Sequence, residues 1–137
     1  MNDAAWSRLI NQIRDGYVVP VLGPQLLVGP DGRESLQRKV AERVLALREC
    51  EVDPAELPPF RELDAAMSRL KLTGVPVEEL YGDVDAAIRE LTAAGDAVIP
   101  APLRQLAEIT DFRLFVTLTP DGLLARCARP ELPPLEA

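Results

Sequence analysis

Two short apolar runs constrain the fold more than any other feature of this sequence. Residues 17–22 lie between Gly16 and Gly23, and residues 112–118 form the second run. Runs of this length and composition, bounded by breakers, are typical of strands. About ninety residues with helical patterning and no hairpin signal separate them, so we expect parallel neighbouring strands with a right-handed connection. Pro20 lacks an N–H and is expected on an unpaired side of its strand.

Apolar residues at three- and four-residue spacing predict about five or six helices around these strands. The segments are 3–15, 34–49, 60–70, 77–91, 100–110 and 122–127. Asp3 is the expected N-cap of the first helix, where Trp6 is expected in the core, and Gly82 leaves open whether 77–91 is one helix or two. The predicted fold is therefore helix-rich α/β with a minimal parallel sheet.

The length of 137 residues is that of one ordinary domain, which we expect over 1–129, followed by an extended tail over 130–137. The formal charge of −7 repels phosphate backbones, so nucleic acid is not an expected partner. No apolar run approaches the length of a spanning helix, and no targeting segment is evident. We expect a cytoplasmic protein without a membrane partner, in which Cys50 and Cys127 are small, buried or half-buried hydrophobic side chains and not a disulfide.

The sequence contains no histidine, which removes the commonest general base and the commonest metal ligand. Two isolated cysteines do not form a thiolate zinc site. Acidic residues are abundant, but abundance of this kind is typical of a solvated surface. We therefore expect no catalytic residue and no metal site.

Ligands of open α/β sheets bind at the carboxyl ends of the strands, where loops and helix N-termini present backbone N–H groups. The first strand is followed by a breaker-rich loop over 23–32, and the second is followed by 117–121. The candidate binding residues at these two ends are Gly23, Pro24, Gln25, Thr117, Thr119 and Asp121. Asp121 is equally interpreted as the N-cap of the helix that follows.

This layout resembles the NAD-binding Rossmann-type core of the bacterial sirtuin-like family, in a degenerate and truncated form. In that family the first strand ends in Gly-Ala-Gly-x-Ser and a later strand ends in Thr-x-Asn-x-Asp. Gly23, Thr117 and Asp121 match these motifs. Departures from the motifs occur at Pro24 and Gln25, and at Thr119, which stands where the family has its catalytic Asn. The resemblance implies a Rossmann-like fragment that binds NAD or a related nucleotide weakly at these residues.

Three functions remain open on this evidence. The first is a non-catalytic nucleotide-binding, assembly or regulatory module, in the bacterial defence or signalling setting that the resemblance implies. The second is an active sirtuin-like NAD hydrolase that uses Asp121 with Thr119. The third is a helical protein-interaction domain without a nucleotide site.

We expect this chain to associate with another protein surface. A sheet of two strands leaves both edges with unpaired backbone groups, and residues 112–118 contain no breaker that blunts their edge. We therefore expect self-association or docking on a further protein domain, through the second strand and the helix with Leu123 and Leu124. Helices are expected to bury the two strands through Val40, Val44, Leu106 and Ile109.

Overall fold

The computed structural model describes residues 2–29, 34–93 and 99–128. Its internal contacts divide the chain into two compact units. We call Met1–Gly23 with Pro102–Ala137 the sheet unit, and Pro24–Ala101 the helical unit. The extended tail predicted for 130–137 lies outside the described residues.

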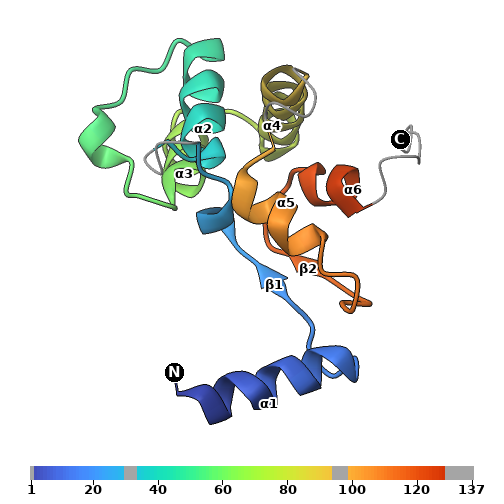
Figure 1. The fold of residues 1–137 in the computed structure, drawn as a ribbon. Coiled ribbons are helices and arrows are strands. Elements are labelled where there is room, and N and C mark those ends of the chain that lie inside the picture. The colour runs from blue at the N-terminus through green and yellow to red at the C-terminus, as the bar shows by residue number, and fades with distance from the viewer. Residues whose placement is uncertain (1, 30–33, 94–98, 129–137) are drawn as a thin grey trace. The chain divides into compact units, whose positions relative to one another are not determined.

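The helical unit is built on α2 (Leu36–Leu47), α3 (Glu62–Leu72) and α4 (Val77–Thr92), with α2 packed on both of the others (Figure 1). Two single turns of 3-10 helix precede α2 and α3, namely η1 (Pro24–Leu26) and η2 (Pro54–Glu56). Helix α4 runs through Gly82 without interruption, which decides between the two interpretations of that segment.

The three helices enclose an aliphatic core of their own. Its buried members are Val40, Ala41, Val44, Leu45, Leu57, Ala66, Leu70, Leu80, Val84, Ala87 and Ile88. Val40 and Val44 are buried, as expected, and belong to this cluster. Leu47, which follows them in the same apolar pattern at the end of α2, is 47% exposed.

The sheet unit contains α1 (Asp3–Arg14), β1 (Val21–Leu22), β2 (Val116–Thr117) and α6 (Leu123–Ala128). Helix α5 (Ala101–Ala107) begins at the boundary between the units. Strands β1 and β2 are parallel neighbours, as predicted, with Val21 opposite Val116 and Leu22 opposite Thr117. The Val116 N–H donates to the Pro20 carbonyl over 2.9 Å, so Pro20 takes part as an acceptor and needs no N–H. Each strand is much shorter than its apolar run.

The prediction that helices bury both strands is wrong for one face of the sheet. Leu22 is buried, whereas Val21 is 59% exposed and Val116 is 39% exposed. Ile109, expected as a covering residue, is itself 39% exposed, and Leu106 is half-buried. Side chains alternate between the faces of a strand, so covering one face of a two-stranded sheet leaves every second side chain outside.

Helix α1 is amphipathic and well capped, but none of its residues is buried. Trp6, expected in the core, is 50% exposed. The N-cap is Asn2 rather than Asp3, because the Asn2 Oδ1 accepts from the Ala5 N–H over 2.9 Å. Gly16 ends the helix in the left-handed conformation, with φ of 77°. In none of the described ranges is there a helix long and apolar enough to cross a membrane.

Candidate functional site

The carboxyl ends of the two strands lie together in the sheet unit, as a parallel pairing requires. The Leu118 N–H donates to the Leu22 carbonyl over 2.8 Å, at the last step of the ladder. Gly23 follows Leu22 directly, so the structure brings Gly23 and Thr117 to the same sheet edge. Thr117 is exposed and Thr119 is half-buried. Two parts of the predicted site are thus neighbours.

The loop after β1 lacks the features of a tight phosphate turn. A Cβ added to Gly23 would meet no atom within 4 Å, and its φ lies outside the left-handed region. Neither backbone conformation nor space therefore requires glycine at this position. Pro24 and Gln25 form the start of η1 and belong to the helical unit, where Gln25 is exposed.

Asp121 is the most informative of the predicted residues. Its Oδ1 accepts the Leu123 N–H over 3.0 Å, which is the capping interaction expected at the start of α6. Its Oδ2 is buried and has no hydrogen-bond partner among the described residues. Buried carboxylate oxygens normally accept hydrogen bonds, so this atom offers a free acceptor next to the strand ends. The capping role is shown, and the second oxygen keeps a ligand-facing role open.

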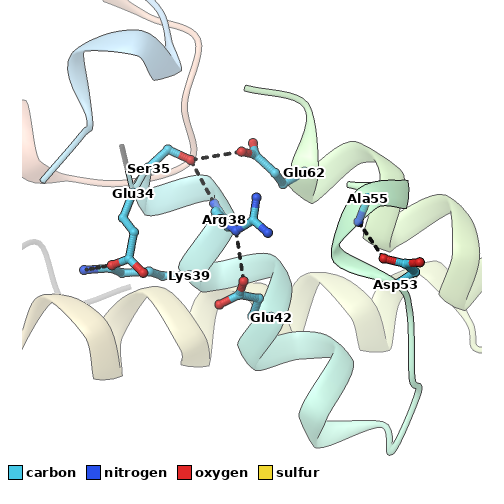
Figure 2. A network of polar contacts seen from close by, with 8 residues as sticks. All are labelled: Glu34, Ser35, Arg38, Lys39, Glu42, Asp53, Ala55 and Glu62. Carbon is cyan, nitrogen blue, oxygen red and sulfur yellow. Dashed lines mark hydrogen bonds and ion pairs between the residues drawn. The ribbon is translucent and has the colours of Figure 1, made fainter. Parts of the chain in front are cut away.

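A second polar cluster, which the sequence analysis missed, lies in the helical unit (Figure 2). Ser35 caps α2, because its Oγ accepts the Arg38 N–H over 3.1 Å. The same hydroxyl donates to Glu62 Oε1 over 3.4 Å, and Glu62 is only 4% exposed. Glu62 Oε2 is buried without a partner in the part of the chain that the structure describes. A Ser before an amphipathic run does signal a cap, but nothing in the sequence indicates that Glu62 is buried.

Ion pairs cover the outside of the helical unit. Arg48 joins α2 to α4, with its Nε 2.6 Å from Asp83 Oδ2 and one terminal nitrogen 3.1 Å from Glu79 Oε2. The hydrogen bond to Asp83 raises the pKa of Arg48 above its ordinary value, and that to Glu79 acts in the same direction. Since the guanidinium is charged in the folded and the unfolded chain below that value, its charge state gives folding no pH dependence near neutrality. We assign this network to the packing of α2 on α4.

The helical unit also carries an open hollow of about 590 Å³. It is lined by Glu42, Leu45, Ala46, Cys50, Glu51, Val52, Asp53, Pro54 and Leu57. None of the predicted binding residues lines this hollow. Cys50 and Cys127 are both half-buried, as predicted. Within the described ranges, no group of three or more Cys, Asp or Glu is placed to hold a metal ion.

No family model, curated protein or solved structure matches the chain. The sirtuin-like resemblance therefore rests on the sequence motifs alone and stays a prediction.

Proposed function

We propose that this chain is a non-catalytic module that acts by association, through the uncovered face of its small parallel sheet. Val21 and Val116 are directly opposite each other in the register, so both project from one face. Leu118 lies two residues beyond Val116 and is 67% exposed. The single observation that carries the proposal is this exposed apolar face, which we call the open face and define as Val21, Val116 and Leu118.

The residues flanking the strands extend the same pattern. Val19 and Leu114 lie two residues before Val21 and Val116 and are 44% and 58% exposed. Contiguous apolar surface of this kind is uncommon on monomeric proteins and marks interaction sites. A two-stranded sheet is also marginal by itself and gains stability when a further layer covers it. A protein surface seated on the open face supplies that layer.

Backbone geometry favours the same conclusion. The N–H groups of Val116 and Leu118 donate towards β1, so the N–H of Thr117, between them, points to the outer edge of β2. An unpaired edge beside an apolar face is the arrangement to which an added strand binds. Leu123, which we expected to join this surface, is 1% exposed and belongs to the interior instead.

The test compares two exposed leucines in the two units. Light scattering and sedimentation over a wide concentration range measure association of the wild-type chain, of Leu118→Glu and of Leu72→Glu. Leu72 is 83% exposed in α3 and serves as the matched control. We expect Leu118→Glu to weaken association by at least about tenfold and Leu72→Glu to leave it unchanged. A wild-type chain that is monomeric throughout, or equal effects of both variants, would refute the proposal.

A second candidate function is nucleotide binding by a Rossmann-like fragment, and the free Asp121 Oδ2 favours it. A carboxylate oxygen beside the carboxyl ends of parallel strands is a suitable acceptor for a ribose hydroxyl. Asp121→Asn is a conservative test, because the amide oxygen keeps the cap on Leu123 while the second position becomes a donor. Asp111→Asn, on an exposed residue of the same unit, is the control.

Calorimetric titration with NAD separates the candidates. Weak binding that Asp121→Asn abolishes and Asp111→Asn preserves supports the nucleotide site. Equal affinity in all three proteins, or no binding by the wild type, contradicts it. Release of nicotinamide that disappears in Asp121→Ala would instead establish the NAD hydrolase.

A further inference from the structure

Helix α1 is capped at both ends, yet its apolar side is only partly covered. Asn2 caps its first turn, and at its end the Gly16 N–H donates to Ile13 O and the Tyr17 N–H to Gln12 O, each over 3.0 Å. This pair of bonds is a Schellman motif, which fixes the last turn. The apolar stripe nevertheless lies partly open, because Trp6 is 50% and Ile10 45% exposed while Leu9 and Ile13 are half-buried. The stripe consists of Trp6, Leu9, Ile10 and Ile13.

We propose that the stripe packs, antiparallel, against α1 of a second copy of this chain. The inference rests on the proposed function, because it names the partner of the same module. It concerns a different surface, however, so the helix pair and the open face of the sheet are tested separately.

The charged residues beside the stripe indicate that the partner is a second copy of the chain and that the two helices are antiparallel. Asp3 and Arg14 are about three helical turns apart, so they lie on the same flank of the stripe. In an antiparallel pair, Asp3 of each helix is therefore opposite Arg14 of the other. In a two-fold parallel pair the same flank of the two helices lies on opposite sides of the contact, so these charges would not meet. Neither side chain takes part in an ion pair within the described ranges.

The apolar stripe has the same symmetry as the charges. A two-fold axis near Leu9 and Ile10 places Trp6 of one helix against Ile13 of the other. The centre of the Asp3–Arg14 pair falls at nearly the same place along α1. One rotation therefore satisfies the apolar and the charged positions together, as a self-complementary two-fold contact requires. The remaining charge within the helix, Arg8, lies on the opposite side and stays in water.

The helix pair alone is a weak contact. Two helices of 12 residues bury much less than the roughly 1,200 Å² typical of stable interfaces. We therefore expect rapid, reversible pairing that strengthens with concentration. Trp6 reports it directly because it is the only tryptophan of the chain. Its emission is expected to shift to shorter wavelength as the concentration rises and Ile13 of the other copy covers the ring.

Complementary charge variants give the sharpest test. Asp3→Lys makes the flank entirely basic, and Arg14→Glu makes it entirely acidic. Each variant alone is expected to pair at least about tenfold more weakly than the wild type, because both symmetry-related ion pairs become repulsive. An equimolar mixture restores attraction at both contacts, so pairing and the Trp6 shift return. Arg8→Glu, on the opposite side of α1, is the control and leaves pairing unchanged.

Failure of this inference differs from failure of the proposed function. If the mixture pairs no better than either variant, while Leu118→Glu still weakens association, the α1 pair is overturned and the open face stands. Circular dichroism checks that both variants keep their helix. If either loses it, Ile10→Ser takes its place, since it lies far from both caps and adds no charge. Unchanged association and an unchanged Trp6 shift in Ile10→Ser would overturn the pairing.

Discussion

The two units of this chain treat apolar residues in opposite ways. The helical unit encloses its apolar residues in a continuous cluster, in which Ala41, Val44 and Ala66 have no exposed surface. In the sheet unit the apolar side chains that the structure describes as buried are Leu22, Leu103 and Leu123. Most of its other large apolar side chains are exposed, from Trp6 and Ile10 in α1 to Leu114 and Leu118 beside β2. This contrast is the basis on which we propose that the sheet unit, and not the helical unit, takes part in association.

The largest expected effect comes from truncating one leucine in each unit. Leu70 is 1% exposed in the helical core, and Leu114 is 58% exposed beside β2. We expect Leu70→Ala to lower the free energy of unfolding by about 3 kcal/mol, since it leaves a cavity between packed helices. Leu114→Ala is expected to cost less than about 0.5 kcal/mol. Urea denaturation at low protein concentration, where association does not contribute, measures both.

The same two variants also give the result that would contradict this difference between the units. A cost for Leu114→Ala that matches that of Leu70→Ala would mean that the sheet unit buries its apolar surface within the monomer. The open face would then be part of the core and not a docking surface.

The N-cap residues of α1 and α2 allow the two units to be compared by the hydrogen bonds of an exposed and a buried polar side chain. Ser35 is 2% exposed and accepts one hydrogen bond while it donates another to Glu62. Asn2 makes a similar cap on α1 in full exposure. We expect Ser35→Ala to cost about 2 kcal/mol, because it removes a cap and leaves a buried Glu62 oxygen without its donor.

Asn2→Ala removes a cap only, and water replaces the lost bond. Its expected cost is about 0.5 kcal/mol. Thermal unfolding of both variants gives the measurement, and Ser35→Thr, which keeps the hydroxyl, is the control for the buried site. Equal costs at Ser35 and Asn2 would show that the bond to Glu62 contributes nothing.

The spacing of apolar residues predicted most of the helices, because an amphipathic helix has an apolar residue on its buried side at every turn. The positions of α2, α3 and α4 follow from apolar spacing and from breakers such as Pro58 and Gly74. The parallel pairing of β1 with β2 followed from the lack of a hairpin between them. These are local or topological constraints, which a single sequence contains.

Burial could not be predicted in the same way. Trp6 and Val21 are apolar at the correct spacing, but spacing does not say whether the chain itself supplies a cover. Glu62 is the opposite case, since an acidic residue in a first helical turn is usually solvated. In the folded chain Glu62 accepts a hydrogen bond from Ser35, which lies 27 residues away in the sequence. At the candidate site, the predicted parallel pairing placed Gly23 near Thr117, but the sequence did not show that the backbone at position 23 does not require glycine.

Helix ends give a smaller comparison between the units. Gly16 ends α1 with φ of 77°, and an added Cβ would lie 3.2 Å from the Arg113 Nε in the same unit. We expect Gly16→Ala to cost about 1 kcal/mol through left-handed strain and this crowding. Gly74, at the end of α3, is also left-handed, with φ of 92°, but an added Cβ there would have free space around it. Thermal unfolding is expected to show a smaller loss for Gly74→Ala. Equal losses of stability would mean that the Arg113 side chain moves away from the added Cβ at no cost in free energy.

The smallest expected effect has the opposite sign and lies at the end of α2. There the Glu49 N–H donates to Ala46 O over 3.1 Å and the Cys50 N–H to Leu45 O over 2.9 Å, which is the same motif that ends α1. Glu49 nevertheless occupies the left-handed position without being glycine, with φ of 52°. Glu49→Gly relieves about 1 kcal/mol of strain, and the greater freedom of glycine in the unfolded chain offsets about half of that. We therefore expect a gain of about 0.5 kcal/mol in the free energy of unfolding. Glu49→Ala, which removes the carboxylate but keeps the Cβ, separates strain from charge, and an equal gain in that variant would assign the effect to the charge.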